Sequence, residues 1–233
     1  MRTAFAIAAK DLRAEARSKE VAPAMLLFAL ALVFLFTFAL PPGSGRAPVP
    51  LPRAGSVGAR EIASVFLWSS LLFAAIVGFG RSAALEREGS RLDALVLAPV
   101  DPALVFAGKA IANFLYLSFI AILVFFSFVV FIGVAPSAIL GFLPVALVTN
   151  IGLAVIGTLF GTATQYSRAK ELLLPLLIFP TVLPLLLAAI RLTSETLVHG
   201  DPFTETRWFI LIAVYDIVFA TIGAVTFEFV IRE

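Results

Sequence analysis

The chain has 233 residues, of which 61% are hydrophobic and 14% are charged, and its mean hydropathy is +1.06. This composition excludes an ordinary water-soluble domain, because about a quarter of the residues of such domains are charged. The net charge of +2 is too small to indicate nucleic-acid binding, and the absence of cysteine excludes disulfides, thiolate metal ligands and cysteine nucleophiles.

The first segment, residues 3–20, has the pattern of an amphipathic helix at a membrane surface. One helical stripe is formed by Phe5, Ala8, Ala9, Leu12 and Ala16, and charged residues, most of them basic, fall on the other faces. We therefore expect an interfacial helix over residues 1–20, lying on the cytoplasmic surface.

Hydrophobic segments that are each long enough to cross a bilayer, which takes about 20 apolar residues, make up most of the remaining chain. They are predicted at residues 21–40, 62–80, 110–132, 138–160, 172–190 and 208–230. The first is longer than the core of a signal peptide and has no small-x-small cleavage site after it, so it is predicted to remain as a span. The loop that follows it is rich in proline and glycine, which predicts extended structure. The predicted fold is an all-α membrane protein with six transmembrane helices in a single domain of residues 1–233.

Lysine and arginine are distributed unevenly between the two sides of this arrangement. With the amino terminus inside, the inner segments hold 12 of these residues and the outer segments hold 5. Because segments rich in lysine and arginine stay in the cytoplasm, both termini are predicted to be cytoplasmic.

The loop between the second and third spans carries the most informative pattern. Leu92, Leu95 and Val96 lie on one helical face at the spacing i, i+3, i+4, and charged residues lie elsewhere. This predicts a short amphipathic helix that Pro99 ends.

The next helix is predicted to begin with Asp101 as its N-cap and Pro102 in its first turn. From Pro102 to Ile132 it would be about 46 Å long at 1.5 Å per residue, whereas the hydrocarbon core is about 30 Å thick. Its first two turns, up to Lys109, are therefore expected to project into the cytoplasm, where a rigid helix can transmit the motion of a partner. On the residues alone, a solvated connection between two spans fits equally well.

A longer run in the same loop is Glu88-Gly89-x-x-x-Asp93-x-Leu95-x-Leu97-x-Pro99, with Pro102 and Lys109 after it. This run resembles the intracellular loop of type-2 ABC exporter permeases, which contacts the nucleotide-binding subunit in that superfamily. The resemblance implies a type-2 ABC transporter transmembrane domain. The residues to which it assigns ATPase coupling are Glu86, Arg87, Glu88, Gly89, Arg91, Leu92, Asp93, Leu95 and Pro99.

Two further segments carry a narrower pattern. One is the arginine-rich run Asp11-Leu12-Arg13-Ala14-Glu15-Ala16-Arg17-Ser18-Lys19-Glu20, and the other is the proline-rich stretch from Gly157-Thr158-Leu159-Phe160 to Ile178-Phe179-Pro180. Together with the loop, they resemble the haem exporter protein B family, the permease subunits of the ABC transporter of bacterial cytochrome c maturation. The first outer loop departs from this resemblance, since it is longer and richer in proline and glycine than expected. That departure concerns the packing of the loop only.

The resemblance implies a multi-pass subunit of the bacterial inner membrane with no enzyme activity of its own, with haem as the implied cargo and no cofactor bound directly. No G-x-x-x-x-G-K-[ST] run occurs in the sequence, so ATP would be bound by a partner. The implied partners are a cytoplasmic ABC ATPase subunit, a haem-handling membrane subunit and a periplasmic haem chaperone, within the lipid bilayer. Because type-2 permeases need two membrane halves, a homodimer and pairing with a different subunit both fit.

Two other functions remain open at this point. One keeps the ABC architecture and changes the cargo to a lipid, a peptide or a drug. The other is a passive scaffold that holds assembly factors in the membrane and transports nothing.

Asp216 is predicted to lie about 12 Å inside the sixth span, where a carboxylate is costly and should have a partner. Its candidate partners are Arg191, Arg207, Tyr215, Tyr116 and Asn150. Asn150, Tyr215 and Asp216 are candidates either for the translocation path or for polar contacts between helices.

Other residues in the spans are predicted to shape the packing of the helices. The spacing Gly157-x-x-x-Gly161 permits close helix approach. Proline frees backbone carbonyls and kinks a helix, so the three prolines of the fifth span predict either a gate or a shape needed for packing. These prolines are Pro175, Pro180 and Pro184. Trp68 is expected to face lipid or the membrane interface, and no metal site is predicted.

Overall fold

The computed structural model of the chain describes residues 2–39, 59–88, 101–165, 167, 169–199 and 202–232. Within these residues the secondary structure is helical. In chain order the elements are α1 (Arg2–Ser18), α2 (Val21–Ala39), α3 (Ala59–Glu88), α5 (Pro102–Ile132), η1 (Pro136–Ala138), α6 (Ile139–Thr164), α7 (Lys170–His199), η2 (Pro202–Glu205) and α8 (Thr206–Arg232). The prediction of an all-α fold is confirmed.

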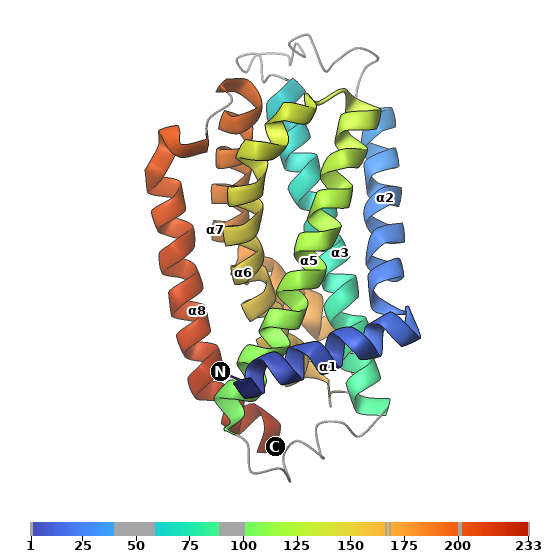
Figure 1. Ribbon diagram of the computed structural model, residues 1–233, viewed down its shortest axis with the longest axis vertical. Helices are drawn as coiled ribbons and strands as arrows, with labels where there is room; N and C mark the ends of the chain where they lie inside the picture. Colours follow the sequence, from blue (N-terminus) through green and yellow to red (C-terminus); the bar gives the residue numbers. More distant parts are fainter. Residues whose placement is uncertain are drawn as a thin grey trace.

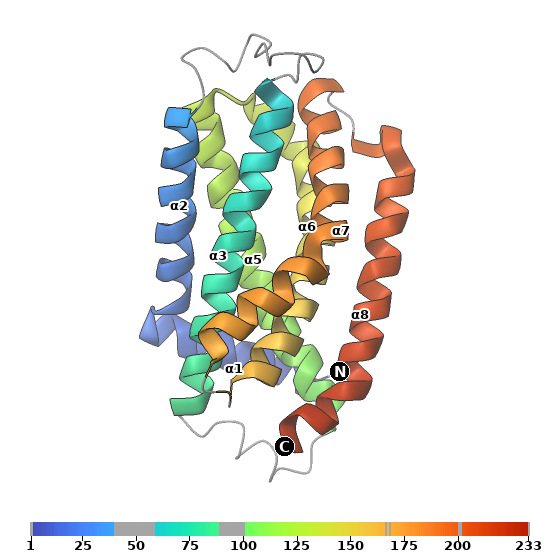
Figure 2. The same cartoon turned by 180° about the vertical axis from the view of Figure 1, so that it is seen from behind.

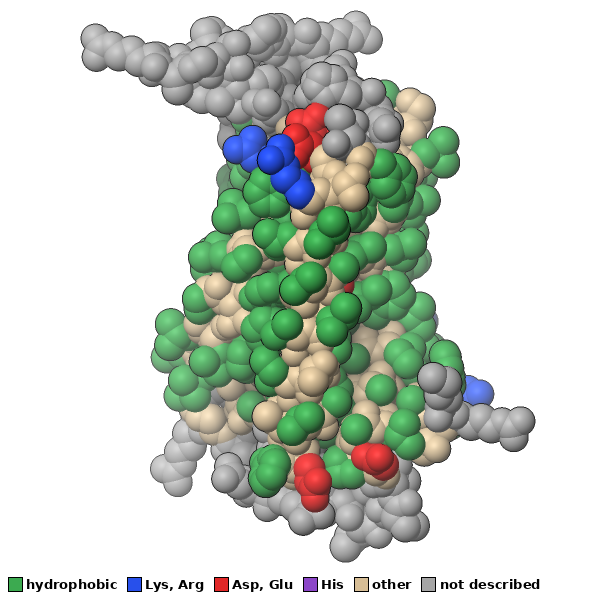
Figure 3. All heavy atoms as spheres, turned by 90° about the vertical axis from the view of Figure 1, so that its left-hand side faces the viewer, with side chains coloured by type: hydrophobic (Ala, Val, Ile, Leu, Met, Phe, Trp, Pro, Cys, Tyr) green, Lys and Arg blue, Asp and Glu red, His purple; other side chains and the backbone are tan. Residues whose placement is uncertain are grey.

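Six helices, α2, α3, α5, α6, α7 and α8, are long and apolar enough to cross a membrane. They stand side by side in one bundle, with α1 across one end (Figure 1). Hydrophobic side chains cover the middle of the face seen in Figure 3, and charged side chains gather near the two ends. This distribution is expected of a protein that lies within the hydrocarbon core of a membrane. The chain is a multi-pass membrane protein with the six predicted spans.

The second and fifth spans belong to helices that are longer than predicted. The sequence indicates spans at residues 62–80 and 172–190, whereas α3 continues to Glu88 and α7 to His199. Hydropathy marks where apolar residues end, but a helix continues for as long as its residues favour helix. The eight residues after Gly80 include alanine, leucine, arginine and glutamate, which are among the strongest helix formers.

The surface helix α1 is present as predicted, but its buried side matches the predicted stripe only in part. Ala8 of that stripe is buried, together with Ala4 and Ile7 outside it, whereas Phe5 is 64% exposed. An interfacial helix has two apolar neighbours, the protein and the membrane, so a stripe of apolar residues does not by itself identify the side that packs on protein. Residue 108 of α5 must be glycine for this contact, because a Cβ there would lie 2.8 Å from the backbone oxygen of Ala4.

Both ends of α5 have the caps that its sequence favours. The side chain of Asp101 accepts a hydrogen bond of 2.9 Å from the backbone N–H of Ala103, and Pro102 follows in the first turn. These caps were predicted. At the other end, Gly133 ends the helix in the left-handed conformation, with φ of +80°, which glycine adopts without strain.

The main core lies between α2, α3, α5, α6, α7 and α8 and contains Trp68 with several phenylalanines that are fully buried. The expectation that Trp68 faces lipid or the interface is therefore wrong. Its indole N–H donates a hydrogen bond of 2.9 Å to the hydroxyl of Thr193 in α7. This partner satisfies the polar atom that would otherwise favour the membrane interface.

A second, smaller core lies at the end of the bundle that carries α1. It joins four helices, and its buried members are Ile7, Val105, Phe106, Val155, Leu159 and Phe227. The ring of Phe106 packs beside that of Phe227, with centroids 5.3 Å apart. It fits there because residue 223 is glycine: a Cβ at Gly223 would lie 2.2 Å from the Phe106 ring.

Candidate functional site

The predicted coupling loop lies mostly outside the described residues. This applies to Gly89, Arg91, Leu92, Asp93, Leu95 and Pro99, and with them to the predicted amphipathic helix. Glu86, Arg87 and Glu88 form the last turn of α3. The helices that flank the loop are described: α3 ends at the same end of the bundle where α5 begins, and α1 lies across that end (Figure 1).

The first two turns of α5, which were expected to project from the span, are packed against other helices. Val105 and Phe106 are 2% and 3% exposed, and both belong to the small core that links α5 to α1, α6 and α8. The first turns of α5 are therefore in contact with three other helices.

A group of polar side chains, which we call the polar layer, lies just inside this end of the bundle. Its members are Glu15, Lys109, Asn113, Tyr116 and Thr158. A cavity of about 60 Å³ lies between α1, α3 and α5, and Glu15, Lys109, Asn113 and Tyr116 are among the residues that line it. Lys109 and Glu15 are buried, with 5% and 8% exposure.

Within the polar layer, Glu15 fixes the corner between α1 and α2. Its Oε1 accepts hydrogen bonds of 2.8 Å from the backbone N–H groups of Val21 and Ala22, in the first turn of α2. A carboxylate is well placed there, because it satisfies orphan donors and lies at the positive end of the helix dipole. Lys19, with φ of 55°, makes the turn between the helices.

Two further hydrogen bonds tie α5 to its neighbours. The hydroxyl of Tyr116 donates to the backbone oxygen of Asp11 in α1 at 3.2 Å. The amide of Asn113 donates to the hydroxyl of Thr158 in α6 at 2.8 Å. The polar layer thus connects the base of α5 to both α1 and α6.

The structure separates the polar residues that were predicted near the middle of the bundle. Asn150 of α6 donates to the hydroxyl of Ser118 in α5 at 3.5 Å. Tyr215 of α8 donates to the backbone oxygen of Thr181 in α7. Asp216, one residue further along, is buried against α6 instead. These three residues therefore face different helices and do not form one cluster.

The predicted partners of Asp216 make their hydrogen bonds elsewhere. Tyr215, Asn150 and Tyr116 bond to the groups named above, Arg207 pairs with Glu205, and Arg191 is exposed. Among the described residues, Oδ1 of Asp216 has no hydrogen-bond partner, and the same holds for Oδ1 of Asn150 and Oγ1 of Thr149. Tyr215, Tyr116, Asn150 and Arg207 thus bond to acceptors in the backbone, on another helix or in the turn before α8, and not to Asp216.

Glycine at position 152 makes room for Asp216. A Cβ on Gly152 would lie 2.3 Å from Oδ1 of Asp216 and 2.8 Å from a methyl group of Leu185. The absence of a side chain on α6 therefore lets α8 bring its carboxyl into the bundle.

The three predicted prolines all lie inside α7, and the helix changes direction along its length (Figure 2). The predicted kink is confirmed. The backbone oxygen that Tyr215 bonds belongs to Thr181, between Pro180 and Pro184. The bent part of α7 is thus held by α8.

A comparison with known protein families identifies the family of this chain. The family model described as CcmB protein matches residues 2–232. The chain belongs to the CcmB protein family. A curated relative, Heme exporter protein B of Rhodobacter capsulatus, is 31% identical over 141 residues, covering 60% of this chain and 64% of the relative. The match thus spans just under two thirds of the length of that relative, and the predicted family resemblance is confirmed.

In this CcmB-family chain, the polar layer is the feature that sequence reasoning missed. A signal was present: Lys109, Asn113 and Tyr116 are polar residues spaced by four and three in an otherwise apolar helix, so they share one face. Their partners on α1 and α6 are 105 and 45 residues away in sequence. No local pattern identifies contacts at such separations.

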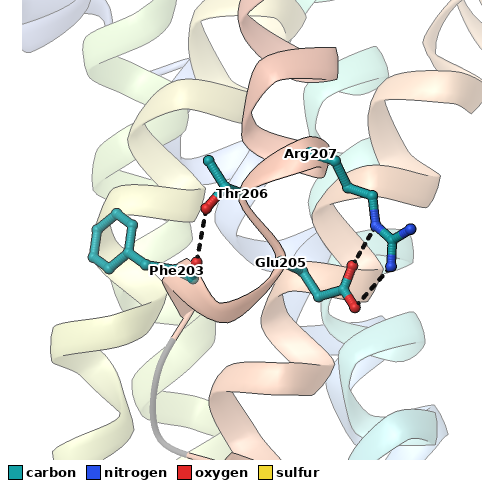
Figure 4. Close-up of polar contacts among 4 residues, drawn as sticks. All are labelled: Phe203, Glu205, Thr206 and Arg207. Carbon is teal, nitrogen blue, oxygen red and sulfur yellow. Dashed lines mark hydrogen bonds and ion pairs between the residues drawn. The ribbon is translucent and has the colours of Figure 1, made fainter.

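The opposite end of the bundle holds an exposed ion pair. In Figure 4 the guanidinium of Arg207 faces the carboxylate of Glu205, with Nε to Oε2 at 2.7 Å and Nη2 to Oε1 at 3.1 Å. The hydroxyl of Thr206 donates to the backbone oxygen of Phe203 at 3.0 Å. The hydrogen bond from Arg207 holds the pKa of the Glu205 carboxyl below its usual range. Arg207 thus serves the turn before α8 and does not reach Asp216.

Proposed function

We propose that this chain is the permease subunit of an ABC transporter complex for haem export or delivery in cytochrome c maturation. The CcmB family match over residues 2–232 carries this proposal. The name of the relative, Heme exporter protein B, supports haem as the cargo. The output is either transport of haem or release of a haem-loaded chaperone.

A separate cytoplasmic ATPase subunit binds and hydrolyses ATP in this proposal. It docks on the loop between α3 and α5, for which the coupling residues Glu86 to Pro99 are the candidates. A haem-handling membrane subunit and a periplasmic haem chaperone complete the complex, and the second membrane half is either another copy of this chain or a different subunit. The permease itself holds no cofactor and performs no catalysis.

The proposed location is the inner membrane of a bacterium, with both termini in the cytoplasm. The excess of lysine and arginine at the α1 end supports this orientation. The ends of α3 and α5 that flank the loop lie at the same end (Figure 1). The loop and a cytoplasmic ATPase are then on the same side of the membrane.

The packing at the base of α5 supports a route for the coupling. A push on the loop reaches α5 through its first turns, which are buried against α1, α6 and α8. The hydrogen bonds of Tyr116 and Asn113 carry the displacement to α1 and α6. Contiguous packed side chains of this kind are a physical basis for coupling between sites. Asn150, Tyr215 and Asp216 are candidates for the path, and the bend of α7 at Pro175, Pro180 and Pro184 is a candidate gate.

The test is Glu88→Lys in the full complex. We expect loss of the ATPase stimulation that the membrane subunit gives, and loss of cytochrome c maturation, with the chain still present in the membrane. Glu20→Lys is the matched control, because Glu20 is exposed and carries the same charge change outside the loop. Unchanged ATPase stimulation and maturation in both Glu88→Lys and Gly89→Pro would support a passive scaffold instead.

The cargo has its own test. The tagged chain is purified in mild detergent, the accompanying proteins are identified and the haem absorption spectrum is recorded. Haem-handling membrane partners and a haem spectrum are expected. Copurification of an ATPase alone, without haem, would favour another cargo such as a lipid, a peptide or a drug.

A further inference from the structure

A cavity of about 530 Å³ lies between α3, the end of α6 and the beginning of α7. It is separate from the polar layer and from the mid-bundle polar residues. Its apolar wall includes Ile76, Leu174 and Pro175, and its polar lining includes Arg81, Gln165 and Glu171. The volume lies within the range of about 300 to 1,000 Å³ that is usual for small-molecule sites.

Gln165 is the most unusual residue of this cavity. Its side chain is fully buried, and among the described residues neither the nitrogen nor the oxygen of its amide has a hydrogen-bond partner. Native proteins rarely leave a buried polar group unpaired, so each exception calls for an explanation. A ligand with both donor and acceptor groups would satisfy this amide after rotation about its side-chain bonds.

The cavity also carries one charge of each sign. Arg81 and Glu171 are both exposed at its wall, and within the described part of the chain no ion pair joins them. Each therefore remains available to a group of opposite charge on a ligand. The pair favours a zwitterion over a purely anionic molecule, because Glu171 repels the anion that Arg81 attracts.

The cavity lies at the depth of a membrane where zwitterions are abundant. One of its walls ends with Ala84, where the second span ends, and another begins with Glu171, where the fifth span begins. Residues at the ends of spans meet lipid headgroups, whereas the apolar wall formed by residues such as Ile76 meets acyl chains.

We propose that this cavity binds a phospholipid whose headgroup carries a phosphate and a primary ammonium, of the phosphatidylethanolamine type. Arg81 binds the phosphate through charge-assisted hydrogen bonds. Glu171 accepts hydrogen bonds from the ammonium. Gln165 bonds the glycerol ester region, and the first part of an acyl chain lies against Leu174. This binding would tie α3 to α7 at the α1 end of the bundle.

Native mass spectrometry of the full chain tests this site with three lipids of equal chain length: phosphatidylethanolamine, phosphatidylglycerol and phosphatidylcholine. We expect the ethanolamine lipid to bind about tenfold more tightly than the other two, because phosphatidylglycerol lacks a cation and phosphatidylcholine lacks ammonium N–H donors. Equal binding of phosphatidylcholine, or a preference for phosphatidylglycerol, would overturn the inference.

Two variants separate recognition from a structural role. Gln165→Leu keeps the approximate volume and removes the hydrogen bonds, and we expect about fivefold weaker binding of the ethanolamine lipid. Glu171→Lys places two cations at the cavity, and we expect it to reverse the preference toward phosphatidylglycerol. Glu20→Lys has the same charge change away from the cavity and should leave the preference as it is. If Glu171→Lys kept the wild-type preference, or if Glu20→Lys altered it equally, the site would be refuted even should Gln165→Leu fail to fold.

Discussion

Two glycines of α6 share one sequence motif but make different contacts in the structure. The spacing Gly157-x-x-x-Gly161 permits close helix approach. In the structure, a Cβ on Gly157 would lie 2.1 Å from the ring of Phe79, whereas one on Gly161 would lie 3.9 Å from its nearest neighbour, the backbone oxygen of Phe79. Only the first glycine is required by the packing of α3 on α6.

These two positions give a matched pair of substitutions. Gly157→Ala is expected to lower the free energy of unfolding by about 1 to 3 kcal/mol, because the new methyl group overlaps a buried ring. Gly161→Ala should change it by no more than about 0.5 kcal/mol, since its methyl group meets ordinary van der Waals distances. Thermal unfolding of both variants in the same detergent measures the difference. Equal destabilisation would mean that α3 and α6 approach each other in another way.

The ion pair of Glu205 with Arg207 makes the stability of the fold depend on pH. Because the pKa of Glu205 is lower in the folded chain, the pair stabilises the fold above the unfolded value of about 4.3. That stabilisation is lost as the pH falls through the lower, folded value. Both groups are accessible to solvent, so the effect is small.

Wild type and Glu205→Gln are to be compared at neutral and at acidic pH. The unfolding temperature of the wild type should exceed that of the variant near neutral pH, and the difference should vanish once the pH is below the lowered pKa of Glu205 in the folded chain. A difference that stayed constant across this range would show that the stabilisation does not depend on the carboxylate charge.

At the scale of elements, Glu15 acts as the cap of a helix to which it does not belong. The first turn of α2 has no acidic residue of its own, and the carboxylate of α1 supplies the acceptor. This contact holds a surface helix against the first span. It also explains why a charged residue is buried at the inner side of α1.

Substitution of Glu15 tests this cap. Glu15→Ala is expected to cost about 1 to 2 kcal/mol of stability, since two backbone N–H groups lose their acceptor. Glu15→Gln keeps an acceptor oxygen and should cost less. Limited proteolysis between α1 and α2, together with the unfolding temperature, reports the loss. A Glu15→Ala chain as resistant as the wild type would show that the small core and the hydrogen bond of Tyr116 to Asp11 hold α1 without this cap.

The contact between α5 and α6 can be measured with a double-mutant cycle. Asn113→Leu and Thr158→Val each remove one side of a partly buried hydrogen bond, and the double variant removes both. We expect the double variant to be less destabilised than the sum of the single variants, by about 0.5 to 1.5 kcal/mol. ATPase stimulation measured on the same variants should fall in each. Additive effects on stability would mean that the two side chains do not interact.

The sequence predicts elements better than it predicts their ends and faces. The six spans, the surface helix, the caps Asp101 and Pro102 and the kink of α7 all follow from local patterns of hydropathy, capping and proline. The extension of α3 beyond Gly80 does not follow from such patterns, because the hydrophobic segment ends at the first charged residue. The burial of Trp68 does not either, because its partner Thr193 lies 125 residues away.

At the scale of the whole molecule, polar groups are sorted by position along the bundle. The polar layer lies at the α1 end, and the ion pair of Glu205 lies at the other. Between them, buried polar atoms such as Oδ1 of Asp216 lie within an apolar bundle. The ends of α3 and α5 that flank the proposed coupling loop, the polar layer and the cavity proposed to bind lipid lie at one end of the bundle (Figure 1).

The candidate site could be predicted only in part, because much of it depends on contacts between residues that are far apart in the sequence. The loop between the second and third spans is identifiable from its sequence, because its pattern is contiguous. The polar layer joins residues of α1, α5 and α6, and the separation of Asn150, Tyr215 and Asp216 depends on how α8 rotates against its neighbours. Such rotations depend on packing around the whole bundle.

The central claim, that the loop before α5 faces the cytoplasm and docks an ATPase, has one direct test. The chain has no cysteine, so Ser90→Cys introduces a unique thiol in that loop. A maleimide that does not cross membranes should label this thiol in inverted membrane vesicles and not in intact cells, and the ATPase subunit should protect it from labelling. Labelling from the outside of intact cells, or labelling that the ATPase leaves unchanged, would contradict the account.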